Sequence, residues 1–174
     1  AFGSAPPPSP FGCTDEQAIG RGVVEASLLG VDAALDPAAL EAMASYVAQL
    51  FAPCSVTELA WVDEAQRAPE RSLLESPAAF LYLQHLEERW GSGKLGELSY
   101  SLVAVSGQRT PPGSPLVDEP DVLDALRVSL QRNDSSLAAG ALDFAVARAF
   151  LGSRSDDAHL VDVTRYGDSG RPRH

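Results

Sequence analysis

Two short segments and three histidines carry the residue types that most often do chemistry. Gly91-Ser92-Gly93-Lys94 contains the Gly-Lys pair of a phosphate-binding loop, whose glycine-rich backbone cradles phosphate oxygens. That loop also needs a glycine five residues before the pair and a hydroxyl residue after the lysine. Glu88 and Leu95 occupy these positions here. A helix is expected before the glycines, so we predict that this segment is a helix C-terminus and not a phosphate site.

The second segment is Gly167-Asp168-Ser169-Gly170, followed by Arg171. It resembles the residues around the nucleophile of trypsin-like serine proteases. The resemblance implies a double β-barrel and a histidine that activates the serine. The chain has no TAAHC-like histidine segment upstream, and its pattern is helical. We therefore assign no catalytic residue to this segment.

Single titratable residues give weaker candidates for a pocket. His85 falls on the polar side of its expected helix, beside Glu88 and Arg89, and we expect it to be solvated. Asp143 lies within a nearly all-apolar segment, where a buried carboxylate can act as an acid with a raised pKa. Together with Arg109, these residues are the pocket candidates for a helical enzyme or small-ligand carrier.

No metal ion or cofactor is predicted. Asp156, Asp157 and His159 lack the closely spaced cysteines and histidines of structural zinc. The acidic residues between 118 and 124 lack the twelve-residue spacing of a calcium loop.

Cys13 and Cys54 are the only cysteines. In an exported protein they would form a disulfide, and in a reducing compartment they would be two ordinary thiols. The sequence begins at Ala1, and its only methionine is Met43. This is compatible with a processed organellar or exported protein, or with a fragment, so the localisation stays open.

Other residues favour contact with a protein partner. Pro6, Pro7 and Pro8 predict a polyproline II conformation, which SH3-like and WW-like modules bind, although a surface tail is the simpler reading. Trp61 projects away from the apolar stripe of its expected helix. It is either an interface anchor or covered by another element of the same chain.

Composition limits the possible partners. The 174 residues carry a formal charge of −11, with 45% hydrophobic and 21% charged residues. This is a globular composition. The absence of a basic stripe argues against nucleic-acid binding. No apolar run reaches the roughly 18 residues of a membrane span, so no membrane insertion is expected.

Hydrophobic periodicity and capping residues predict the elements that position these side chains. Thr14 with Gln17 and Ser55 with Glu58 have capping-box spacing, Asp36 precedes Pro37, and Gly91 ends a helix. The expected helices span about 14–30, 36–53, 55–68, 76–90, 120–132 and 136–151. The last is apolar on nearly every side, so it should lie at the centre of the domain or against a partner.

The fold class is therefore mainly α: a compact domain of five to six helices, with a minor two-stranded element at about 98–105 and 160–166. We expect a proline-rich arm at 1–13, a helical domain at 14–152 with a loop at 106–120, and a C-terminal extension at 153–174 formed by one strand and a disordered tail. The leading functional hypothesis is a non-catalytic accessory subunit that binds protein partners. The first alternative is the enzyme or ligand carrier, and the second is an exported module stabilised by a Cys13–Cys54 disulfide.

Overall fold

The computed structural model describes residues 12–31, 35–52, 54–68, 77–91, 93–94, 96–98, 122–151, 154, 156 and 158–160. This part of the chain is mainly α-helical, as predicted, with 81% of its residues in helices and none in strands. In chain order the elements are α1 (Cys13–Val31), α2 (Pro37–Phe51), α3 (Ser55–Arg67), the 3-10 helix η2 (Pro77–Ala79), α4 (Phe80–Trp90), α6 (Val122–Arg132) and α7 (Leu137–Arg148).

Several helix ends follow from the side chains that the sequence places there. The Ala39 amide donates to Asp36 Oδ1 at 3.1 Å, which confirms Asp36 as the cap of α2. Gly91 ends α4 with a φ of 95°, a conformation that glycine adopts without steric cost, and its amide donates to the Glu87 carbonyl. Ser136 caps α7 by accepting a hydrogen bond from the Ala139 amide.

Two expected capping boxes are wrong. The first turn of α1 begins at Cys13, where the Gly12 carbonyl accepts from the amides of residues 15 and 16, so Thr14 lies inside the helix. The N-cap of α3 is Cys54, which makes no side-chain capping bond, and Ser55 is already helical. The cap position lies two residues earlier than predicted in α1 and one residue earlier in α3.

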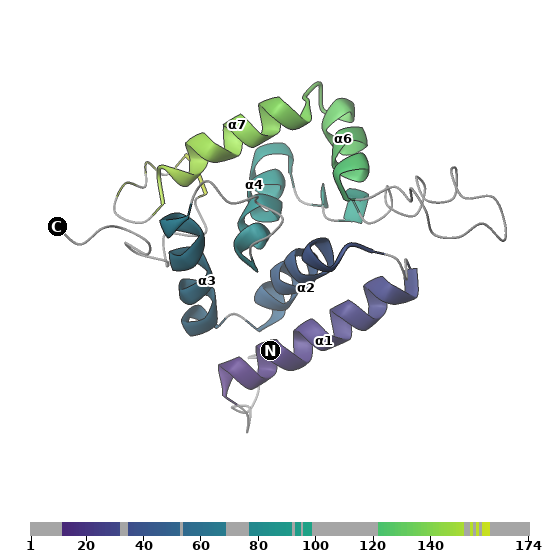
Figure 1. Ribbon diagram of the computed structural model, residues 1–174, viewed down its shortest axis with the longest axis vertical. Helices are drawn as coiled ribbons and strands as arrows, with labels where there is room; N and C mark the ends of the chain where they lie inside the picture. The colour runs from purple at the N-terminus through teal and green to yellow at the C-terminus, as the bar shows by residue number, and fades with distance from the viewer. Residues whose placement is uncertain are drawn as a thin grey trace, which may run out of the picture.

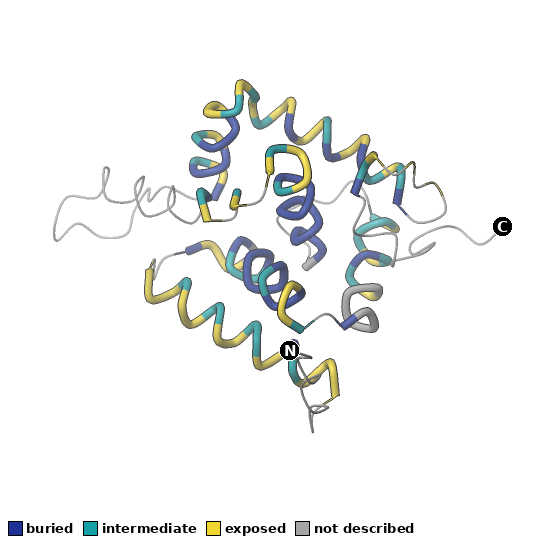
Figure 2. Tube along the Cα trace, turned by 180° about the vertical axis from the view of Figure 1, so that it is seen from behind, coloured by how far each residue is buried: buried dark blue, intermediate teal, exposed yellow. Residues whose placement is uncertain are grey.

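The centre of the molecule is α4, which the other helices surround (Figure 1). All seven residues from Phe80 to Leu86 are buried, and α4 is dark blue over this length in Figure 2. The last helix does not lie at the centre, so the first of the two expectations for it is wrong, and contact with a partner stays a prediction. Gly140, Phe144 and Ala147 of α7 are buried, and its other residues are half-buried or exposed. Five of the 12 residues of α7 are alanine, so the helix is apolar without the side-chain volume that forms a core.

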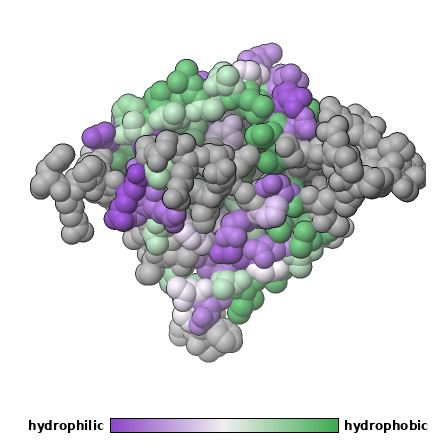
Figure 3. All heavy atoms as spheres, viewed as in Figure 1, coloured by the Kyte–Doolittle hydropathy of each residue, from purple (hydrophilic) through white to green (hydrophobic). Residues whose placement is uncertain are grey.

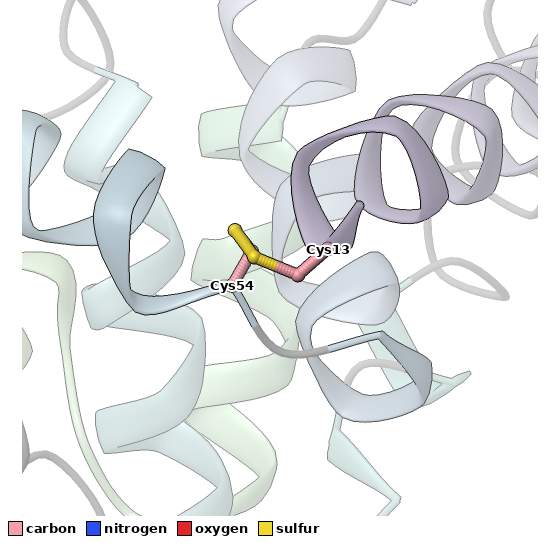
Figure 4. Close-up of a disulfide and its surroundings, with 2 residues drawn as sticks. All are labelled: Cys13 and Cys54. Carbon is pink, nitrogen blue, oxygen red and sulfur yellow. A yellow bond between two sulfur atoms is a disulfide. The ribbon is translucent and has the colours of Figure 1, made fainter. Parts of the chain in front are cut away.

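A disulfide between Cys13 and Cys54 fastens α1 to the segment between α2 and α3 (Figure 4). Along its length α1 packs on α2, and Gly20 lies close to Ala48. The only buried residue of α1 is Gln17, so this helix lies on the surface of the domain (Figure 2). Its attachment therefore depends on the disulfide, on packing against α2, and on Arg21, which contacts Glu41 of α2 and the ring of Trp61 in α3.

Two clusters of polar side chains join segments that are far apart in the sequence. Arg148 of α7 donates to the Ala65 carbonyl at 2.8 Å and to Gln66 Oε1 at 3.0 Å, which joins α7 to α3. Lys94 contacts Glu97 Oε2 at 2.8 Å and Asn133 Oδ1 at 3.1 Å, which joins the segment after α4 to the end of α6. The hydrogen bond from Lys94 is the main cause that lowers the pKa of Glu97.

The predicted strands fall almost entirely outside the described residues. Leu98, the first residue of one predicted strand, is helical, and Leu160, the first residue of the other, lies in a bend. Residues 1–11 of the arm predicted at 1–13, the loop at 106–120 and residues 161–174 also lie outside the described part of the chain. The predicted end of the arm is wrong by one residue, because Cys13 already belongs to α1. No helix among the described residues is long and apolar enough to cross a membrane.

Candidate functional site

A cavity of about 300 Å³ lies where α4, α7 and residues 158–160 meet. From α4 it is lined by His85, Glu88 and Arg89, from α7 by Asp143, and from the last segment by His159 and Leu160. The structure therefore brings together two of the predicted pocket residues, His85 and Asp143, which are far apart in the sequence. The third, Arg109, lies outside the described residues.

His85 is buried, with an exposed fraction of 4%, and the expectation of a solvated histidine is wrong. The ring of Phe144 from α7 lies 5.6 Å away and that of Trp90 lies 6.4 Å away. Burial is the main cause that lowers the pKa of His85. The charge of Asp143 opposes this shift, while Arg89 and His159 add to it. The imidazole is therefore neutral near pH 7.

Asp143 lies at the mouth of the cavity and not in the core. Its Oδ2 accepts a hydrogen bond from Arg89 Nε at 3.0 Å and lies 3.7 Å from His85 Nε2. The second distance is too long for a hydrogen bond. His85 Nε2 has no hydrogen-bond partner among the described residues, although it is shielded from solvent.

His159 is held on the opposite side of the cavity. Its Nδ1 lies 2.8 Å from Asp156 Oδ2, and its ring stacks on Phe150 with 4.6 Å between centroids. The carboxylate of Asp156 also accepts the amides of residues 158 and 159, so the whole turn is fixed. This arrangement orients the ring and leaves Nε2 as the nitrogen for a ligand.

The described part of the lining offers two imidazoles, two carboxylates and one guanidinium. These groups can bind a polar ligand and exchange protons with it. Among the described residues, no group of three or more metal-binding side chains could hold a metal ion.

A second feature is the outward side of α7, which we call the α7 outer face. It consists of the exposed residues Ala138, Ala139, Ala141, Leu142, Ala145, Val146 and Ala149. Leu142 is 68% exposed and Val146 is 45% exposed. Figure 3 shows a broad hydrophobic area over this helix. None of the seven side chains is polar, whereas Asp143 and Arg148 lie at the two edges of the face.

The remaining predicted interaction residues are placed as follows. Trp61 is half-buried, with the Arg21 guanidinium 5.3 Å from its ring centroid and Phe80 at 6.3 Å. Residues of α1 and α4 thus contact this tryptophan within the same chain, while its role as an interface anchor stays a prediction. Pro6, Pro7 and Pro8 lie outside the described residues.

Sequence reasoning did not assign Arg89 and His159 to the pocket. Arg89 lies one turn after His85, and this spacing places both on one side of a helix. His159 lies three residues after Asp156, in a segment whose path no periodicity predicts. Only the structure shows that this segment returns to α4.

Comparisons with protein-family models, with curated proteins and with solved structures found no match to this chain.

Proposed function

We propose that this chain is a non-catalytic accessory subunit, and that the α7 outer face docks an apolar helix of a partner protein. The observation that carries the proposal is that all seven outward residues of α7 are alanine, leucine or valine. A surface helix ordinarily presents charged or polar residues to solvent. Contiguous exposed apolar patches commonly mark protein interfaces.

The composition of the face favours a helix as the occupant. Five of its seven residues are alanine, and small side chains let two helix backbones approach closely. Leu142 and Val146 project from this flat surface and are the two side chains able to fill holes in a facing helix. The partner's facing residues must be apolar, because no side chain within the face can accept a hydrogen bond or pair with a charge.

Net charge favours a different protein over a second copy or a lipid surface. The chain carries a formal charge of −11, so two copies repel each other, and anionic lipid repels the chain as well. A partner that is neutral or basic overall has no such cost.

The test compares two matched variants. Leu142→Glu places a charge in the α7 outer face, and Ile19→Glu places the same charge on α1, where Ile19 is 57% exposed. Both should leave the free energy of unfolding within about 0.5 kcal/mol of the wild type, because neither side chain is in the core. The full chain and both variants are tagged and recovered from the native organism, and the stoichiometry of captured proteins is measured.

We expect a protein near one-to-one stoichiometry with the wild type and Ile19→Glu, and its loss with Leu142→Glu. A cross-link between this protein and α7 then identifies the contact. If the wild type and both variants capture the same amount of this protein, or if both variants lose it, the assignment of the contact to α7 is wrong. Sedimentation of the isolated chain as a dimer that Leu142→Glu disrupts, or its binding to anionic vesicles through α7, would replace the proposed partner with a second copy or a membrane.

A further inference from the structure

The cavity between α4 and α7 has a lining that is richer in hydrogen-bond acceptors than in donors. Among the described residues of this lining, Glu88 and Asp143 contribute two carboxylates, and Arg89 contributes one guanidinium. Arg89 Nε already donates to Asp143. These three side chains sum to one net negative charge, which favours a cation over an anion.

The two imidazoles point to a ligand that donates hydrogen bonds. His159 lines the cavity, and its Nδ1 lies 2.8 Å from Asp156 Oδ2. When Nδ1 donates its hydrogen to Asp156, Nε2 is left as an acceptor for a ligand. His85 Nε2 is buried and has no hydrogen-bond partner among the described residues. Buried polar atoms in proteins are nearly always hydrogen-bonded, and a ligand in the cavity can supply the partner that this nitrogen lacks among the described residues.

We propose that this cavity binds a small organic ammonium ion. The ammonium group lies between Asp143 and the imidazoles of His85 and His159, to which it donates its hydrogen bonds. The attached hydrocarbon packs on Leu160, which is part of the same lining. This site is separate from the α7 outer face. Asp143 is not one of the seven residues of that face, and its carboxylate pairs with Arg89 of α4.

Three probes of similar size separate charge from simple hydrocarbon burial: n-butylammonium, n-butanol and butyrate. The readout is the set of ring C–H signals of the three histidines in the full chain, measured by NMR at neutral pH and assigned with His85→Gln and His159→Gln. We expect saturable shifts of His85 and His159 with butylammonium and none with butyrate. His174 serves as the internal reference for non-specific effects.

Two charge variants make opposite predictions at the same site. Asp143→Asn removes the carboxylate and frees Arg89, so butylammonium binding should weaken by about threefold. Arg89→Gln frees Asp143, so binding should strengthen by about threefold. Both residues are partly exposed, which lets the fold tolerate the changes. Asp134→Asn is the matched control, since Asp134 does not line the cavity, and its affinity should be unchanged.

Several results would overturn the proposal. Equal affinity for all three probes would show burial of hydrocarbon alone. Preference for butyrate would show an anion site built on Arg89. Shifts of His174 that match those of the other histidines, or no saturable shift at all, would show that the cavity is not a binding site.

Discussion

At the scale of single residues, the imidazole of His85 links burial to proton affinity. It lies under Phe144 of α7, with Arg89, Asp143 and His159 as the charged and titratable groups around it. Burial removes the water that would stabilise its charged form, so its folded pKa falls below the ordinary value of 6.5. In the unfolded chain, by contrast, the pKa of His85 is near that ordinary value.

This difference makes a prediction for stability against pH. Between about pH 6.5 and the lower folded pKa of His85, the unfolded state binds more protons than the folded state. The stabilisation from neutral His85 is therefore fully present above about pH 6.5 and falls as the pH falls through this window. Urea unfolding at a series of pH values should show this decrease in the wild type. His85→Gln should show a smaller decrease, and equal slopes in both proteins would contradict the assignment.

The burial of His85 was not predictable from its neighbours in the chain. Glu88 and Arg89, one turn away, mark a polar side of the helix, and periodicity alone places His85 there. The structure covers this side with α7 and the turn at residues 158–160. A contact between segments about 60 to 75 positions apart leaves no trace in a helical window, because the window extends over only a few turns.

At the scale of elements, the helices and several of their ends follow from local chemistry. Asp36 and Gly91 act as predicted because capping depends on the side chain and backbone of the residue itself. Which helix occupies the centre depends instead on side-chain volume. The sequence of α4 contains Phe80, Tyr82 and three leucines, whereas the apolar residues of α7 are mostly alanine, so α4 fills the core.

Close packing between α4, α6 and α7 depends on Gly140. A Cβ added there would lie 3.1 Å from Tyr82 Oη and 3.3 Å from both methyl carbons of Leu130. Tyr82 is itself buried, which raises its pKa to about 12 and shows how little water reaches this contact. Both neighbours are buried, and they would have to move by a few tenths of an ångström to make room.

We therefore expect Gly140→Ala to lower the free energy of unfolding by about 1–2 kcal/mol, because the overpacking exceeds the gain in helix propensity. Gly22→Ala in α1 is the matched control. A Cβ at Gly22 meets nothing within 4 Å, so this variant should gain about 0.5–1 kcal/mol. Denaturant unfolding measures both. If the free energy of unfolding rose by a similar amount in both variants, α7 would not pack tightly at Gly140.

At the scale of the whole molecule, the disulfide compensates for the small buried area of α1. Cys13 and Cys54 are 41 positions apart, and closing a loop of this length removes conformational entropy from the unfolded chain. The chain-entropy relation gives a stabilisation of about 4 kcal/mol. Disulfides of this kind persist in oxidising compartments, which the exported alternative requires.

Two measurements test this account. The untreated protein should show no free thiols under denaturing conditions. A reductant that releases two thiols should lower the free energy of unfolding by about 2–4 kcal/mol. The double variant Cys13→Ser, Cys54→Ser should not respond to the reductant. A wild-type unfolding curve that stays unchanged after reduction would mean that non-covalent contacts alone hold α1.

The arrangement also places two apolar helix surfaces on opposite sides of the domain. The α7 outer face lies at one end of the view in Figure 1, and α1, with Ile19 and Val23 exposed, lies at the other. The sequence predicts a central position or a partner for the last helix alone, and it does not predict which sides of α1 and α7 remain uncovered. That depends on how the helices pack around α4.

Lys94 has a practical consequence for identifying the partner. It is the only lysine in the chain, its side chain is 18% exposed, and its ammonium group is held by Glu97 and Asn133. Amine-directed reagents, which supply most cross-linking maps and most surface immobilisation, therefore have one shielded side chain to attack. Carboxyl-directed or photoreactive chemistry suits this protein better, because 24 aspartates and glutamates are spread along its sequence.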